Sequence, residues 1–323
     1  MTVERILLVS LDNLGDLVFA SALPAAIRAR FPDATIGLWC KAYTADIAPL
    51  FPHVTWTAAA DPFWDDAPGR SKGAIAPFVS AIWRVRQERF DVALIASPQW
   101  RVAAAVAAAG VPVRVGQRRN YNRGFLTQVL PPADRGRPVV ADLGALLEPL
   151  GIDPSGLTTW LDPTPLEPLR HAYRDRLGAA PIAVINPFVT LPPVGIDWAI
   201  WADVARALVE RNYTVVWHGT AQQLVALRRQ IAFDGRWRSA ESITDGSLRS
   251  GAAILATADV YLGCDSGPLH LSAALGVPVV GVYPLASKLP RFAPQGRAVS
   301  RIVDGTISAA AILEAFDSLL AYR

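Results

Sequence analysis

The stretch CDSGPLHLSAALGVPVVGVYP, from Cys264 to Pro284, decides the fold of this chain. Asp265 ends an apolar run, a Ser-Gly-Pro turn follows, and His270 then lies in a segment with helical spacing before a second apolar run. The pattern predicts a strand, a helix and a strand. The backbone N–H groups at the start of such a helix favour an anion. An acid and a histidine at this point are polar groups that the fold alone does not need.

The same alternation of short apolar runs and amphipathic segments extends outward through most of the sequence. The runs are apolar enough to be buried on both faces, which is typical of parallel strands covered by helices. They span residues 5–10, 34–39, 54–58, 91–96, 111–116, 181–186, 213–219, 259–265 and 277–284. Ligands of such sheets bind outside the carboxyl ends of the strands.

A Pro- and Gly-rich segment, residues 151–170, interrupts the alternation and is the expected linker. We therefore expect two domains, residues 1–160 and 161–323, both doubly wound. The last helix, residues 308–322, is expected to pack back on the first domain.

Composition limits the class of protein. The chain has 323 residues, of which 52% are hydrophobic and 18% charged, so it is expected to be globular and not disordered. It has no uninterrupted apolar run long enough to span a membrane. Cys40 and Cys264 are the only cysteines, and we expect free thiols in a reducing cytoplasm.

Arginines are concentrated between Arg101 and Arg137. This stretch contains seven arginines and a single acidic residue, Asp134. Residues 116–138 in this stretch are polar and contain Gly and Pro, so a long loop is expected. One interpretation is a solvated loop, and the other is a site for an anionic partner such as a phosphorylated lipid. No zinc-ligand spacing or RNA-binding signature supports nucleic acid.

The first strand ends in the turn LDNLGD, with Asp12, Asn13, Gly15 and Asp16. Gly15 allows a tight turn, and a carboxylate at a helix start is favoured by the helix dipole. We interpret Asp12 as a helix cap. In the second half, Asp265 and His270 are interpreted as ligand contacts beside a pyrophosphate cradle. The turn is not a G-x-G-x-x-G fingerprint, and the chain has neither a P-loop nor a G-x-S-x-G elbow.

Two segments together, residues 6–36 and 258–284, resemble glycosyltransferase family 9, the ADP-heptose:lipopolysaccharide heptosyltransferases. The family's first strand ends in a polar turn with Gly-Asp, and its second domain carries Asp-Ser-Gly-x-x-His-Leu-x-Ala-Ala-Leu-Gly. The resemblance implies a GT-B fold of two Rossmann-like domains that face each other across a cleft. It also implies an acceptor on the N-terminal domain, a nucleotide-sugar on the C-terminal domain, and inversion by direct displacement.

The resemblance implies roles for individual residues. Asp16 is expected to be the general base. The expected donor-binding residues are Asn186, Thr190, Asp265, Ser266, Gly267, His270 and Lys288. The expected acceptor-binding residues are Asn13, Gly15, Arg118, Arg119 and Arg123. No metal and no cofactor are expected, and the co-substrate is an ADP-linked heptose. The expected acceptor is an anionic glycolipid of the lipopolysaccharide core, with contact to the inner face of the membrane and no nucleic acid.

One loop departs from the family pattern. In NPFVTLPPVGIDW, Phe188 stands where relatives have glycine, and Ile196 and Asp197 precede Trp198 where relatives have a cation. Two alternatives therefore stay open. One is a transferase with another donor sugar and a small-molecule or protein acceptor, and the other is a catalytically degenerate protein that only binds a nucleotide.

Overall fold

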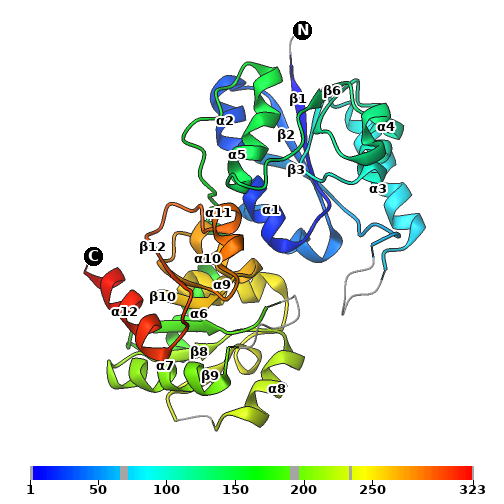
Figure 1. Ribbon diagram of the computed structural model, residues 1–323. Helices are drawn as coiled ribbons and strands as arrows, with labels where there is room; N and C mark the ends of the chain where they lie inside the picture. The colour runs from blue at the N-terminus through cyan, green and yellow to red at the C-terminus, as the bar shows by residue number, and fades with distance from the viewer. Residues whose placement is uncertain (1–2, 66–71, 190–195, 233–234, 322–323) are drawn as a thin grey trace. The chain divides into compact units, whose positions relative to one another are not determined.

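The structure, a computed structural model, describes residues 3–65, 72–189, 196–232 and 235–321. The chain divides into two compact units, Met1–Thr159 and Trp160–Arg323. Each unit contains one six-stranded sheet with helices on both faces (Figure 1). All neighbouring strands are parallel, so the prediction of doubly wound α/β units is confirmed.

The strands of the first sheet follow the order β3-β2-β1-β4-β5-β6. They are β1 (Arg5–Ser10), β2 (Thr35–Cys40), β3 (Val54–Ala59), β4 (Val92–Ile95), β5 (Val113–Gln117) and β6 (Gln128–Leu130). In this order the direction of winding reverses between β1 and β4. The carboxyl ends of these two strands therefore mark the place where a ligand is expected.

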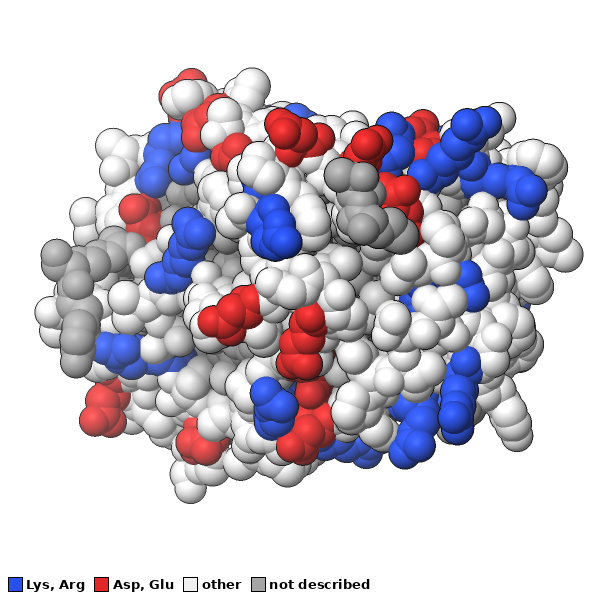
Figure 2. All heavy atoms as spheres, turned by 90° about the horizontal axis from the view of Figure 1, so that it is seen from above, with Lys and Arg blue, Asp and Glu red and all other residues white. Residues whose placement is uncertain are grey.

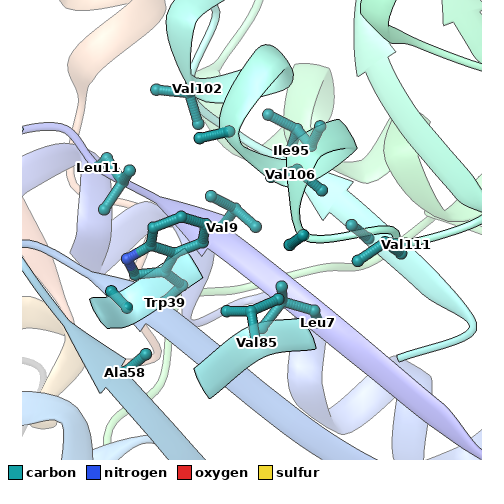
Figure 3. Close-up of a cluster of buried hydrophobic side chains, with 14 of the residues drawn as sticks. Leu7, Val9, Leu11, Trp39, Ala58, Val85, Ile95, Val102, Val106 and Val111 are labelled. Carbon is teal, nitrogen blue, oxygen red and sulfur yellow. The ribbon is translucent and has the colours of Figure 1, made fainter. Parts of the chain in front are cut away.

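Helices cover both faces of the first sheet. They are α1 (Leu14–Ala20), α2 (Leu23–Arg30), α3 (Ile75–Glu88), α4 (Trp100–Ala108) and α5 (Val139–Gly144), with 3-10 helices η1 (Ala42–Leu50), η2 (Asn120–Phe125) and η3 (Ala145–Leu150). Leu7 and Val9 of β1 pack with Val85 of α3 and Val106 of α4 in one apolar cluster (Figure 3). Helices α1 and α5 contact each other, and Figure 1 shows them on the other face. Burial of both faces explains the continuous apolar run of β1.

The second sheet repeats the first, in the order β9-β8-β7-β10-β11-β12. Its strands are β7 (Ile182–Asn186), β8 (Thr214–Trp217), β9 (Trp237–Ser239), β10 (Val260–Cys264), β11 (Val279–Tyr283) and β12 (Ser300–Asp304). Its helices are η4 (Thr164–Leu166), α6 (Glu167–Leu177), α7 (Trp198–Glu210), α8 (Ala221–Gln230), η5 (Ala240–Ser242), α9 (Leu248–Thr257), α10 (Gly267–Ala274), η6 (Ala286–Lys288), α11 (Leu289–Phe292) and α12 (Ala309–Leu320). The winding of this sheet reverses between β7 and β10.

One sequence expectation about local structure is wrong. Residues 116–138 do not form one long loop, because β5 runs to Gln117 and η2 and β6 follow. The Asn122 side chain accepts a hydrogen bond from the Arg119 amide at 2.9 Å and donates to the Gln117 carbonyl at 2.8 Å. Its buried side chain thus holds this segment in a defined turn.

The last helix, α12, contacts α7, β11 and β12 of the second unit, and its buried side chains are Ile312, Phe316 and Leu319. Phe316 packs edge-on against Tyr213 with ring centroids 5.4 Å apart. The apolar face of α12 thus contributes to the core of the second unit. The packing of this helix on the first unit stays a prediction.

Candidate functional site

A polar cluster lies where β1 and β4 end side by side in the first unit. The Ser97 hydroxyl oxygen accepts a hydrogen bond from the Leu11 backbone N–H at 2.7 Å. Ser97 also hydrogen-bonds the Asp12 carboxyl. Burial raises the pKa of Asp12, and the bond to Ser97 and the positive charge of Lys41 offset only part of this effect. Asn13, not Asp12, is the N-cap residue of α1, so the interpretation of Asp12 as a cap is wrong.

Asp16 lies in the first turn of α1, directly beyond the carboxyl end of β1. It is half-buried, as is Gly15, whereas Asn13 is exposed. The partial positive charge of the helix N-terminus favours the ionised carboxylate of Asp16. An ionised carboxylate that solvent can reach is able to accept a proton from a bound hydroxyl.

A cavity of about 380 Å³ adjoins this cluster in the first unit. It is lined by Asp12, Pro98, Gln99, Trp100, Arg101 and Arg119. The Arg101 guanidinium lies over two indole rings, 5.1 Å from the centroid of Trp100 and 6.0 Å from that of Trp64. Aromatic rings with cations are well suited to a sugar that carries an anionic group.

The predicted arginines divide into two groups. All three are exposed, but Arg119 lines the cavity, whereas Arg118 and Arg123 are absent from its described lining. Sequence reasoning missed Gln99 and Trp100 as candidates, and it placed Arg101 in the arginine-rich stretch without assigning it to the acceptor site. The available signal was their place directly after the apolar run that becomes β4. On the face drawn in Figure 2, basic side chains form small groups among acidic and uncharged ones.

A second polar cluster lies beyond β10 in the second unit. Asp265 Oδ1 is 3.5 Å from Nε2 of His270, and Asp265 Oδ2 is 3.3 Å from Nζ of Lys288. Burial alone would raise the pKa of Asp265, but His270 and Lys288 together outweigh it and lower the pKa. Asp265 is therefore an ionised carboxylate held between two donors.

Helix α10 starts beside this carboxylate. Ser266 is its N-cap residue, Gly267 its first residue, and Pro268 follows in the first turn. The first backbone N–H groups of a helix have no intrahelical acceptor, and the helix dipole adds positive potential there. The structure thus brings Ser266, Gly267 and His270 together with Lys288, as the sequence predicted for an anion-binding turn.

An uncharged pair, Asn186 and His218, lies at the ends of the neighbouring strands β7 and β8. Nδ2 of Asn186 lies 3.1 Å from Nδ1 of His218, and Oδ1 of Asn186 accepts a hydrogen bond from the Phe188 N–H at 3.1 Å. Burial lowers the pKa of His218 from its ordinary 6.5 to about 4, so the ring is neutral at pH 7. Sequence reasoning placed Asn186 in the site but missed His218, although it directly follows β8.

Phe188 follows β7 and packs against an aromatic neighbour. Its ring centroid lies 5.8 Å from that of Trp198. A Cβ atom on Gly219 would lie only 2.6 Å from the Phe188 ring, so Gly219 must be glycine for the ring to fit. Asp197 Oδ1 accepts from the Ala199 N–H at 3.0 Å and caps α7. Thr190, the predicted hydroxyl of this loop, lies outside the described residues.

Two further properties of the described ranges concern metal binding and membrane crossing. Among those residues no group of three or more His, Cys, Asp and Glu side chains could hold a metal ion. In the same part of the chain, no helix has both the length and the apolarity required to cross a membrane. Cys40 and Cys264 are buried free thiols.

Comparisons with known proteins agree with this fold. The chain is 23% identical over 320 residues to lipopolysaccharide heptosyltransferase 2 of Escherichia coli K12, covering 93% of this chain and 87% of that protein. Its structure is similar to a glycosyltransferase of family 9 from Veillonella parvula, with a TM-score of 0.82, 18% identity and coverage of 100% and 99%. It is also similar to the E. coli heptosyltransferase WaaC solved with ADP, with a TM-score of 0.80, 16% identity and coverage of 98% and 99%. These likenesses confirm the GT-B fold.

The family model of glycosyltransferase family 9 (heptosyltransferase) matches residues 79–318, which is more than half of the chain. The match spans part of the first unit and nearly all of the second. It includes the turn that carries Asp265 and His270. The protein is therefore a glycosyltransferase that belongs to family 9.

Proposed function

We propose that this protein transfers a heptose from ADP-heptose to a hydroxyl of an anionic glycolipid of the lipopolysaccharide core, with inversion at the anomeric carbon. Family membership supports the reaction class. The names of the E. coli relatives support heptose and lipopolysaccharide. The WaaC structures with ADP and with a fluorinated ADP-heptose support the donor.

The observation that carries the proposal is that a carboxylate follows a switch-point strand in each unit. Asp16 follows β1 in the first unit, and Asp265 follows β10 in the second. Asp265 contacts His270 and Lys288, and Asp16 lies in the first turn of α1. A carboxylate within reach of a substrate hydroxyl can accept its proton.

The second unit would bind the donor. Lys288 and the first N–H groups of α10, at Ser266 and Gly267, would hold the diphosphate. The Asp265 carboxylate can accept hydrogen bonds from sugar hydroxyls, and Asn186 presents an amide at the next strand end. Lys288 and these N–H groups would stabilise the negative charge that the leaving ADP gains, without protonating it.

The first unit would bind the acceptor and supply the base. The acceptor hydroxyl transfers its proton to the Asp16 carboxylate while its oxygen forms a bond to the anomeric carbon. The bond from that carbon to the diphosphate oxygen breaks, and its electron pair leaves with ADP. Attack opposite to the leaving group inverts the configuration. Arg101 and Arg119 would hold an anionic group of the acceptor in the adjoining cavity.

The substitution Asp16→Asn tests this assignment. It keeps the size of the side chain and removes the proton acceptor, so turnover should fall by about 10²-fold or more. Binding of ADP, measured by calorimetry, should stay unchanged. The exposed Asp33, changed to Asn in the same unit, is the control for loss of a negative charge. Near-normal turnover of Asp16→Asn would contradict the assignment.

A second candidate is a transferase of the same fold that uses another donor sugar. It is favoured by Phe188, which packs against Trp198 where relatives have glycine and a nearby cation. A thermal-shift comparison of ADP-heptose with other nucleotide-sugars separates the two. Stabilisation by a different donor, with none by ADP-heptose, would favour the second candidate.

A further inference from the structure

Helix α3 is apolar on two faces. Phe78, Ala81 and Val85 are buried against the first sheet. Three further apolar side chains, spaced four residues apart, lie exposed to solvent: Ile75 at 62%, Val79 at 43% and Trp83 at 59%. Residues four apart lie on one side of a helix, so these three side chains form one line, here called the α3 stripe. A contiguous exposed apolar line marks an interaction surface more often than scattered exposed residues do.

Positive charge adjoins the C-terminal end of the α3 stripe. Here a cavity of about 640 Å³ includes Trp83, Arg86 and Arg89 in its lining. The Arg86 guanidinium lies 5.9 Å from the centroid of the Trp83 ring. Arginines at the edge of an apolar surface can bind phosphate while their neighbours contact acyl chains.

The acids near these arginines are already engaged elsewhere. Asp91 accepts hydrogen bonds from the backbone N–H groups of Glu4 and Arg5 at 2.8 and 2.9 Å. Glu88 forms an ion pair with Arg5. Within the described ranges, no acidic side chain forms an ion pair with Arg86 or Arg89. The cavity therefore has an excess of positive charge.

The N-terminal end of α3 leads toward the cavity proposed for the acceptor. Phe63, itself exposed, packs edge-on against Phe78 of α3 and against Trp64. Nε1 of Trp64 donates a hydrogen bond to Oε1 of Gln99 at 2.9 Å, and Gln99 lines that cavity. Aromatic contacts thus connect the helix that carries the α3 stripe to the acceptor cavity within one unit.

We propose that the α3 stripe, with Arg86 and Arg89, docks on a membrane surface of anionic phospholipid. The inference rests on the proposed function, because a glycolipid acceptor anchored in a membrane must reach the cavity from that surface. Apolar and tryptophan side chains would enter the boundary between headgroups and acyl chains, and the arginines would contact lipid phosphates. Three side chains are few for a stable protein interface, which buries about 800 Å² per partner.

The test is sedimentation with vesicles that contain no acceptor. Vesicles of equal parts phosphatidylglycerol and phosphatidylcholine should bind the protein, and pure phosphatidylcholine should bind it far less. Replacing Ile75, Val79 and Trp83 together by Ser should weaken binding about tenfold or more. Arg86→Gln with Arg89→Gly should weaken it about fivefold for each charge lost and flatten its salt dependence. Arg89 has a φ of 53°, so glycine suits its backbone.

Helix α8 offers a matched control, with exposed Val225 and two arginines. Val225→Ser, Arg228→Gln and Arg229→Gln should leave vesicle binding unchanged. Equal vesicle binding by the α3 stripe variant and the wild type would overturn the proposal, as would equal binding to neutral vesicles. A change from dimer to monomer in light scattering, with vesicle binding intact, would also overturn it and assign the stripe to a second copy.

The docking result is independent of the chemistry. With a water-soluble acceptor fragment, the α3 stripe variant should keep its turnover. Asp16→Asn should lose turnover but still sediment with anionic vesicles. Failure of docking and failure of the proposed function thus give different patterns.

Discussion

The Asn186 side chain is held in one orientation by His218, because the Asn186 amide nitrogen lies 3.1 Å from Nδ1 of the ring. The amide oxygen accepts from the Phe188 N–H, so the amide nitrogen is the donor to His218. Nδ1 must then be unprotonated. Burial lowers the pKa of His218 to about 4, which keeps this nitrogen an acceptor at neutral pH.

The buried, neutral His218 is predicted to make the stability of the fold sensitive to acid. The pKa of His218 falls from 6.5 to about 4 on folding, so between these values the unfolded chain binds more protons than the folded one. Stability is therefore lost as the pH falls from 6.5 toward 4. Thermal unfolding curves should show a smaller loss over this range for His218→Asn than for the wild type.

The exposed His171 on α6 is the control for this experiment. His171→Asn should follow the wild-type pH dependence. Parallel curves for His218→Asn and the wild type would mean that His218 does not titrate abnormally, and the explanation for the Asn186 orientation would fail.

Asp12→Asn is expected to stabilise the protein at neutral pH. Burial raises the pKa of Asp12 in the folded state above its ordinary 3.8, so the folded chain binds more protons than the unfolded one in the window above 3.8. Stability then falls as the pH rises through that window, and the loss remains at pH 7. Removing the charge should therefore raise the unfolding midpoint at pH 7. The gain should disappear below pH 4.

A lower midpoint for Asp12→Asn at pH 7 would contradict this expectation. It would show that the attractions of Lys41 and Arg119 for the Asp12 carboxylate exceed the cost of its burial. Asp46→Asn, an exposed acid in the same unit, controls for the change in net charge.

The sequence predicted the elements that depend on local pattern. Apolar runs marked the long central strands, because strands buried on both faces have no polar side. It did not predict β6, β9 or β12, which lie at or near the sheet edges, have few buried positions and leave little periodic signal. The spacing of apolar residues over 17–30 predicts a single helix, whereas the structure has two, α1 and α2. The break at Ser21 arises because Pro24 has no N–H to continue the ladder, and the Ser21 hydroxyl bonds the Val18 carbonyl at 2.6 Å.

In the candidate site, too, only the features that depend on local pattern could be predicted from the sequence. The turns with Asp16 and Asp265 were visible because their residues are adjacent in sequence. The pairing of Leu11 with Ser97, 86 positions apart, and of Asn186 with His218, 32 positions apart, depends on which strands become neighbours in the sheet. No pattern within either segment contains that information.

The Asp265 network is predicted to bind the nucleotide. Asp265→Ala and His270→Ala should weaken ADP binding in calorimetry more than they lower the unfolding midpoint. Lys288→Gln should weaken ADP binding about tenfold or more, since a hydrogen bond to a charged group contributes about 1.5–3 kcal/mol. Arg291→Gln, in the adjacent short helix, is the control and should have a smaller effect. Unchanged ADP affinity with a large drop in midpoint would make these residues structural.

The arginines of the first unit are predicted to recognise the anionic acceptor unequally. All four arginines are exposed, but Arg101 and Arg119 line the cavity beside Asp12, whereas Arg118 and Arg123 are not part of its described lining. Arg101→Gln with Arg119→Gln should raise the acceptor KM about tenfold or more, because two charge-assisted contacts are lost. It should also flatten the salt dependence of KM, with donor binding unchanged.

Arg118→Gln with Arg123→Gln removes the same charge from the same segment and is the matched control. Exposed arginines that only shape the local potential contribute little individually, so this pair should change KM far less. If both pairs raise KM equally, the acceptor is attracted by overall charge and the cavity does not select it. If neither pair changes KM across a salt series, the arginines do not bind the acceptor. A neutral acceptor, such as a small molecule or a protein hydroxyl, then explains the site better than an anionic glycolipid.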